Sequence, residues 1–167
     1  EDFQAQGINN ELIAPQFELV NVGKLRTRGV ELETTMNPAD GLTVFASGAY
    51  IDARVTEFPD AQCYFGQTAA QGCVRNATTG LFSQDLAGEQ LNNSPDFKFN
   101  VGFNYEKPVG SGIELVTNGN FTWQSEVNFD LTNNPRTVQS SYGLANAAIG
   151  LQGEDERWHV SLFVNNL

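Results

Sequence analysis

The fold is decided by the stretch Phe97-Lys98-Phe99-Asn100-Val101-Gly102-Phe103-Asn104-Tyr105. Every odd position carries a large apolar side chain, and every even position carries Lys, Asn or Gly. Because successive side chains of a β-strand point to opposite faces, the stretch predicts a strand with one apolar and one polar face.

The same alternation extends to other parts of the chain. It is strong at 112–129, where one face carries Ile113, Leu115, Thr117, Gly119, Phe121 and Trp123, and weaker at 30–36 and 158–164. Segments 42–55 and 142–152 are strand-like but rich in Ala and Gly, so their faces are ambiguous. No segment has the three- and four-residue apolar spacing of a helix. We expect an all-β chain of about seven strands, at 1–8, 20–37, 42–57, 95–107, 112–129, 141–152 and 157–167.

The connections between these strands alternate in length. Short turns are expected at 38–41, 107–112 and 153–156, and long polar connections at 9–19, 58–94 and 130–140. In an antiparallel up-and-down meander, every second connection lies at the same end of the sheet. Short turns at one end and long loops at the other are typical of an outer-membrane β-barrel. Soluble antiparallel sheets also alternate, so a secreted β-sandwich remains an alternative.

Composition excludes several classes of protein. The 167 residues carry 9 basic and 20 acidic side chains, a net charge of 9 − 20 = −11, and the pI is about 4.3. A nucleic-acid partner is therefore not expected, because binding phosphates requires a basic face. Apolar runs fall short of the ~20 residues that a membrane-spanning helix needs, so a helical span is not expected either.

The barrel hypothesis makes specific demands on the strands. A sheet in hydrocarbon must pair all its backbone groups and close on itself, which seven strands of this length cannot do. We therefore expect residues 1–167 to be one segment of a larger transmembrane barrel domain, with strands missing on both sides. The side chains expected to face lipid are Phe97, Phe99, Val101, Phe103, Tyr105, Phe121 and Trp123. Their neighbours Lys98, Asn100 and Asn104 would then face a wet or plugged interior.

The long connection 58–94 is the expected place for ligand contact, through Tyr64, Phe65 and Phe82. A passive lid is the alternative interpretation of this loop. Cys63 and Cys73 lie ten positions apart within it and favour a local disulfide, which implies an oxidising compartment. Two unpaired thiols are the alternative.

Charged residues suggest further sites, each with a simpler alternative. Lys24, Arg26 and Arg28 share one face near the external end of their strand and are candidates to bind phosphates of lipopolysaccharide; solvated charge is the alternative. Glu31 and Glu33 share the other face, where paired carboxylates can bind cations or transfer protons, or simply stay hydrated. The single histidine, His159, is interpreted as structural. No catalytic constellation, metal site or cofactor site is expected, so enzymatic function has little support.

Several stretches resemble the barrels of TonB-dependent receptors. Residues 21–33, NVGKLRTRGVELE, are similar to that family's N-x-G-x-x-x-x-x-G-x-E-x-E strand. Residues 41–53, 92–95, 142–146 and 163–167 are also similar to successive strands and strand entries of the family.

The resemblance implies a 22-stranded barrel in the bacterial outer membrane that takes up an iron-siderophore complex, cobalamin or a saccharide as its small-molecule ligand. It also implies that TonB supplies the energy through an N-terminal plug domain. The plug, the TonB-contacting box and the final strand have no counterpart here. A passive porin is the alternative within the membrane class, and a soluble secreted binding module the alternative outside it.

Overall fold

The structure, a computed structural model, describes residues 2–9, 16–77, 80–153, 155 and 157–167. Within these ranges there are β-strands and two single-turn 3-10 helices, and none of the helices is long and apolar enough to cross a bilayer. The long strands are β1 (Asp2–Asn9), β2 (Gln16–Ala39), β3 (Leu42–Glu57), β7 (Phe97–Gly110), β8 (Ile113–Gln124), β11 (Tyr142–Gly153) and β12 (His159–Val164).

These strands pair in the order β1-β2-β3-β7-β8-β11-β12, each beside the long strand that precedes it in the chain. The predicted all-β antiparallel meander is therefore confirmed. β1 and β12 stand at the two ends of this order, so the sheet is open within the described chain. The expected connection 9–19 is largely outside the described residues, since residues 10–15 are not described.

Several strand ends differ from the sequence prediction: β2 covers 16–39 instead of 20–37, and β12 covers 159–164 instead of 157–167. Two further differences follow from where neighbouring strands stop. β8 ends at Gln124 instead of continuing to 129, because Gln124 pairs with Tyr142, the first residue of β11, and the following Ser125 N–H donates to the carbonyl of Phe97, the first residue of β7. β7 continues through Pro108 to Gly110 instead of turning at 107. Its pairing with β3 stops at Tyr105, so the proline lies where β7 has only β8 beside it and no amide N–H is needed on the other side.

The chain forms two compact units, which are described separately. The first, called the loop unit, contains residues 1–29, 51–96 and 126–140, and the second, called the sheet unit, contains residues 30–50, 97–125 and 141–167. β2 and β3 each contribute residues to both units.

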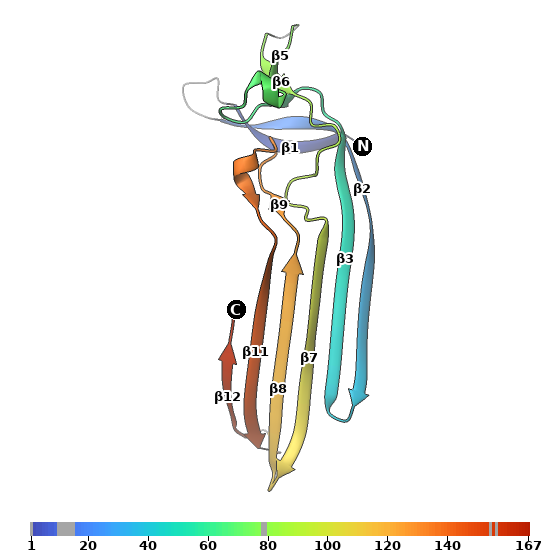
Figure 1. The fold of residues 1–167 in the computed structure, drawn as a ribbon, viewed down its shortest axis with the longest axis vertical. Helices are drawn as coiled ribbons and strands as arrows, with labels where there is room; N and C mark the ends of the chain where they lie inside the picture. The colour runs from blue at the N-terminus through green and yellow to red at the C-terminus, as the bar shows by residue number, and fades with distance from the viewer. Residues whose placement is uncertain (1, 10–15, 78–79, 154, 156) are drawn as a thin grey trace. The chain divides into compact units, whose positions relative to one another are not determined.

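One face of the sheet unit is apolar and uncovered. Register pairs Phe99 with Trp123 and Val101 with Phe121, so that their rings and side chains lie on the same face, where Phe99 stacks on Trp123 at 5.8 Å between ring centroids. Figure 1 shows β7, β8 and β11 side by side as the strands that carry much of this face. The exposed apolar side chains include Val30, Leu32, Phe97, Val101, Phe103, Phe121, Ile149, Leu151, Val160, Leu162 and Val164. None of the buried hydrophobic residues of the described chain belongs to the sheet unit.

The other face of the sheet unit is polar and internally hydrogen-bonded. The Asn146 amide donates to Asn120 Oδ1 at 3.3 Å, and the Gln152 amide donates to Glu114 Oε2 at 2.9 Å. Both bonds join β8 to β11. The predicted alternation of apolar and polar faces is therefore present in the structure, but without a second layer of described residues over the apolar face.

Aromatic rings cover several glycines of this sheet. A Cβ built on Gly119 lies 2.9 Å from Phe103 Cε1, and one built on Gly143 lies 2.5 Å from Phe121 Cζ. Phe45 covers Gly102 in the same way on the polar face. These glycines leave room for the neighbouring ring, which is the reason they are tolerated in strand interiors where glycine otherwise weakens a strand.

The loop unit contains the remaining short elements. Three strands, β4 (Ala61–Gln62), β5 (Val74–Arg75) and β6 (Phe82–Gln84), form one small sheet, and β9 (Val127–Asn128) pairs with β10 (Val138–Gln139) in another. The 3-10 helices are η1 (Ala69–Gln71) and η2 (Pro135–Thr137). Val55, Phe58, Ala61 and Leu86 form a buried cluster, with the partly buried Leu25 and Leu131 packed against it. Both long connections, 58–94 and 130–140, are therefore folded rather than extended polar segments.

Candidate ligand-binding loops

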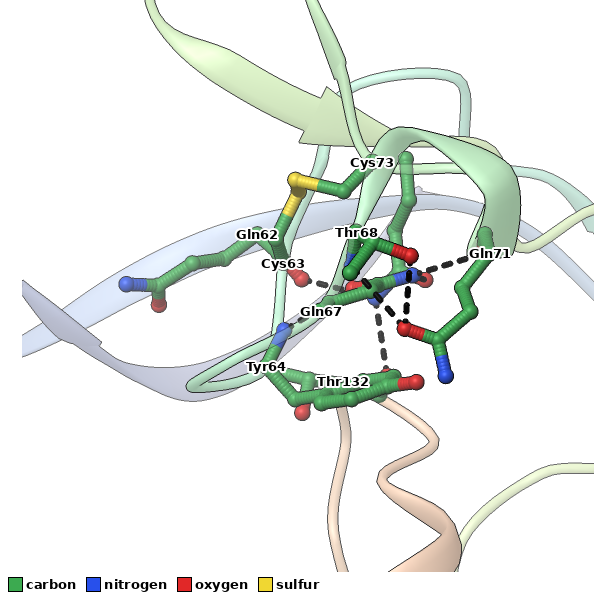
Figure 2. Close-up of a disulfide and its surroundings, with 9 residues drawn as sticks. Gln62, Cys63, Tyr64, Gln67, Thr68, Gln71, Cys73 and Thr132 are labelled. Carbon is green, nitrogen blue, oxygen red and sulfur yellow. Dashed lines mark hydrogen bonds between the residues drawn. A yellow bond between two sulfur atoms is a disulfide. The ribbon is translucent and has the colours of Figure 1, made fainter.

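The connection 58–94 is held by a disulfide and a chain of glutamine amides. Cys63 and Cys73 are bonded, with 5.8 Å between their Cα atoms, so the predicted bridge is present. The Tyr64 N–H donates to Gln67 Oε1 at 3.0 Å, and Gln67 Nε2 donates to the Gln71 carbonyl at 3.0 Å. Figure 2 shows the Gln67 side chain among Tyr64, Thr68 and Gln71, next to the disulfide. Hydrogen bonds and a disulfide within the same connection thus hold the turn that carries Tyr64 in place.

The amide chain continues into a second loop. Gln67 Nε2 also donates to Gln84 Oε1 at 2.8 Å, and Gln84 Nε2 donates to the carbonyls of Gln62 and Thr132, each at 2.8 Å. The Gln84 side chain itself is buried, and its three bonds are partly buried. Because Thr132 belongs to the connection 130–140, this one side chain joins the two long connections.

Asn128 forms a second junction between the same loops. Its amide donates to Asn133 Oδ1 at 2.9 Å, and its carbonyl oxygen accepts from the Thr137 hydroxyl at 2.7 Å. Its backbone carbonyl accepts from Asn93 N–H at 2.9 Å, and Asn133 Nδ2 donates to Glu89 at 2.7 Å. Satisfied polar networks of this kind fix loop geometry, because breaking one bond leaves its buried partner unpaired.

The predicted ligand-contact residues lie on this braced loop unit. Phe65 is 89% exposed and Phe82 is 65% exposed, whereas Tyr64 is half-buried. Phe65 lies between Tyr64 and Gly66 in the turn, and Phe82 begins β6, so the two rings come from different segments. Sequence reasoning did not single out four further exposed apolar side chains of the same unit, Val74, Leu81, Phe129 and Val138.

An ion cluster joins the middle of β2, the last part of β3 and the residue before β7 within the loop unit. Asp52 Oδ2 accepts from Arg28 Nε at 2.9 Å and lies 3.5 Å from an Arg26 amino group, while Asp52 Oδ1 accepts from Arg54 Nε at 3.0 Å. Arg54 also donates to Asp96 at 3.0 Å. We call these five residues the arginine cluster. Lys24, the third predicted cation, pairs instead with Glu57 at 2.5 Å.

Asp52 is the most buried member of the arginine cluster. The hydrogen bond from Arg54 does most to lower the pKa of the Asp52 carboxyl; burial opposes this, and Arg28 and Arg26 add to the lowering. Asp52 lies beyond Tyr50 toward the loops, outside the strand segment 42–50 that pairs with the apolar stretch of β7. The carboxylate therefore stays ionised. It holds the guanidinium groups of Arg26 and Arg28 on β2 and of Arg54 on β3 in place.

The two carboxylates that share a face, Glu31 and Glu33, line an open hollow of about 340 Å³ on the sheet unit. Lys98 and Asn100 of β7 line it from the other side, with Ser47 of β3 between. A lysine is thus near the carboxylates, but the hollow is shallow and open. In the described part of the chain, His, Cys, Asp and Glu side chains nowhere gather in a group of three or more that could hold a metal ion.

A comparison with protein families gives one match that spans the chain. The family model described as TonB dependent receptor-like, beta-barrel, matches residues 1–167. The match covers both the sheet unit and the loop unit.

Proposed function

This chain belongs to the TonB-dependent receptor β-barrel family, and from that membership we infer that it takes up a scarce small-molecule ligand with energy relayed by TonB. Members of the family are transport receptors of the bacterial outer membrane. The ligand classes that we propose are an iron-siderophore complex, cobalamin or a saccharide. Transport, and not catalysis, is the activity we assign.

The observation that carries this proposal is the uncovered apolar face of the sheet unit. A soluble sheet buries its apolar face against a second layer, whereas the buried hydrophobic residues of the described chain all belong to the loop unit. We propose that acyl chains of the outer membrane take the place of that layer. Phe97, Phe99, Val101, Phe103, Tyr105, Phe121 and Trp123 are the lipid-facing residues of this proposal.

The strand pairing supports a larger closed structure. An open edge in hydrocarbon leaves backbone N–H and C=O groups without partners, each at a penalty of several kcal/mol. β1 and β12 are such edges within the described chain. We propose that further strands pair with both, that the closed barrel has the family's 22 strands, and that a plug domain in its lumen makes the contact with TonB.

The ligand-binding role falls to the loop unit. Its aromatic side chains Phe65 and Phe82 are exposed, and a disulfide and two amide junctions brace the segments that carry them. A pre-ordered loop loses less conformational entropy when it binds, so braced aromatic rings suit capture of a dilute ligand. We propose that these two rings, with Tyr64, contact the ligand.

Uptake measurements in cells test the proposal. Cells carrying the full receptor receive a radiolabelled ferric siderophore, cobalamin or oligosaccharide, with TonB present or deleted. We expect uptake of one ligand only when TonB is present, and a weaker apparent affinity in a Phe65→Ala/Phe82→Ala variant. Val109→Ala, at an exposed apolar residue near the end of β7, is the control and should not change the affinity.

Three results would contradict the proposal. Uptake that is equal without TonB would indicate a passive channel. A receptor that stays folded and dispersed in buffer without detergent would indicate a soluble binding module. Unchanged affinity in the double variant would remove the aromatic rings from the ligand site.

A further inference from the structure

The arginine cluster presents two guanidinium groups to the outside of the protein. The side chains of Arg26 and Arg28 are 53% and 69% exposed, while the Asp52 carboxylate that anchors them is only 12% exposed. Arg28 uses Nε for this anchor, and Arg26 uses one amino group at the longer distance. Among the described residues neither guanidinium makes another hydrogen bond, so both keep amino groups for an external acceptor.

The anchoring carboxylate does not cancel the positive charge. Arg26, Arg28 and Arg54 contribute three positive charges and Asp52 and Asp96 two negative ones, which leaves 3 − 2 = +1. This local excess stands out in a chain whose net charge is −11. Salt screens distant charges, so the local potential and not the total charge governs a short-range contact with an anion.

The position of the cluster along the strands indicates what kind of anion. On β2, Arg28 stands two residues before the exposed Val30; on β3, Asp52 stands two residues after the exposed Tyr50. On β7, Asp96 immediately precedes Phe97, the first ring of the aromatic stretch. Three neighbouring strands therefore change from apolar to charged side chains at corresponding positions. In a membrane barrel, that change marks the level of the lipid headgroups.

The chemistry of the two exposed side chains fits a phosphate. A guanidinium group offers planar, parallel N–H donors that match two phosphate oxygens, and such charge-assisted bonds are about twice as strong as neutral ones. Arg26 and Arg28 are two residues apart on one strand, roughly 7 Å along the strand axis. They can therefore contact one phosphate together or two phosphates of one headgroup.

We propose that Arg26 and Arg28, held by Asp52, bind the phosphates of an outer-leaflet phosphorylated glycolipid, lipopolysaccharide. This inference rests on the proposed outer-membrane function. Lys24 remains a predicted contributor, although its ammonium group is already paired with Glu57. Arg54 contributes indirectly, because its hydrogen bonds to Asp52 and Asp96 hold the Asp52 carboxylate in position.

The test measures lipopolysaccharide that stays bound to the purified full receptor. Wild type and Arg26→Gln/Arg28→Gln are extracted from the outer membrane in mild detergent, and bound lipid is counted by mass spectrometry. The control, Arg75→Gln/Arg136→Gln, removes the same charge from two exposed loop arginines. Arg26→Lys/Arg28→Lys keeps the charge but loses the planar fork, and it serves if the Gln variant folds poorly.

We expect the Gln variant to retain at least about tenfold less lipopolysaccharide, because the loss of even one charge-assisted bond has about that effect, and the control to match wild type. The Lys variant should lie between them. Purified wild type stripped of lipid should rebind lipid A that carries phosphates, but not dephosphorylated lipid A, and millimolar inorganic phosphate should not displace it.

The result is separable from the proposed transport function. If TonB-dependent uptake is intact while the Gln variant or the Lys variant retains lipid at the wild-type level, the phosphate site is wrong and the transport proposal stands. Equal loss in the control would show a non-specific charge effect and would also overturn the site. Equal binding of dephosphorylated lipid A, or displacement by phosphate alone, would overturn the assignment to a lipid phosphate.

Discussion

Replacing Val101 with Arg puts a charge on the face that we propose contacts hydrocarbon. Val101 is 40% exposed on the apolar face of β7, opposite Ala46 of β3 and Phe121 of β8. The matched change is Asn100→Arg, one residue away on the polar face, where Asn100 accepts a hydrogen bond from Thr122. Both variants add the same side chain at nearly the same depth, so they differ only in the face that receives it.

The depth of Val101 sets the expected magnitude. It stands four residues from Phe97 and four from Tyr105, the two ends of the apolar stretch. At about 3.4 Å per residue and a strand tilt near 40°, four residues cover roughly 10 Å along the membrane normal. The apolar band of such barrels is about 25 Å tall, so Val101 lies near its middle, where Arg destabilises by about 2–4 kcal/mol. That range corresponds to roughly a 30- to 900-fold change in the folding equilibrium.

The assay is a guanidinium titration of the full receptor in phosphatidylcholine vesicles, followed by tryptophan fluorescence and by mobility on unheated gels. We expect Val101→Arg to lower the free energy of unfolding by about 2–4 kcal/mol, and Asn100→Arg to change it by less than about 1 kcal/mol. Equal effects, or a larger effect of Asn100→Arg, would refute the assignment of the two faces.

Three further predictions concern the loops, the sheet and pH. Replacing Cys63 and Cys73 with Ser should lower the stability of the loop they close by about 2–3 kcal/mol, measured as faster hydrogen exchange at 61–84 with unchanged exchange in β8; unchanged loop exchange would contradict it. Gly119→Val should cost about 1–3 kcal/mol by displacing Phe103, and Phe103→Ala should relieve part of this in the double variant; additive losses would exclude the contact. Because its pKa is lowered in the folded protein, Asp52 should stabilise the loop unit above about pH 4, and this contribution should disappear as pH falls through the lower folded value. Asp52→Asn should flatten that acid-side dependence, and an unchanged pH profile would show that the ion cluster is not the cause.

The sheet could be predicted from sequence because its information is local. Alternation at 97–105 assigns each side chain to a face without knowledge of any partner strand. The segment 42–57 was predicted with its observed bounds, since Asp40-Gly41 supplies a turn before it. The end of β8 at Gln124 could not be predicted, because Val127 and Phe129 continue the alternation after the neighbouring strands have stopped.

The loop unit and the ion cluster depend on non-local contacts, and sequence reasoning found only part of them. The spacing of Cys63 and Cys73 was a sufficient signal for the disulfide. Gln84 gave none, because its role depends on carbonyls from two distant segments. Asp52 and Arg54 were missed because the faces of 42–55 were ambiguous. Only the pairing of β2 with β3 in the structure shows that these two residues lie beside Arg26 and Arg28.

Lipid quenching along β7 measures whether the apolar face of the sheet unit contacts acyl chains. Single cysteines at positions 98, 99, 100, 101, 103 and 104 of the full receptor carry a fluorophore, and the receptor is reconstituted in vesicles whose acyl chains bear bromine. We expect strong quenching at 99, 101 and 103 and weak quenching at 98, 100 and 104. Uniformly weak quenching, or strong quenching at the even positions, would show that the apolar face does not contact acyl chains.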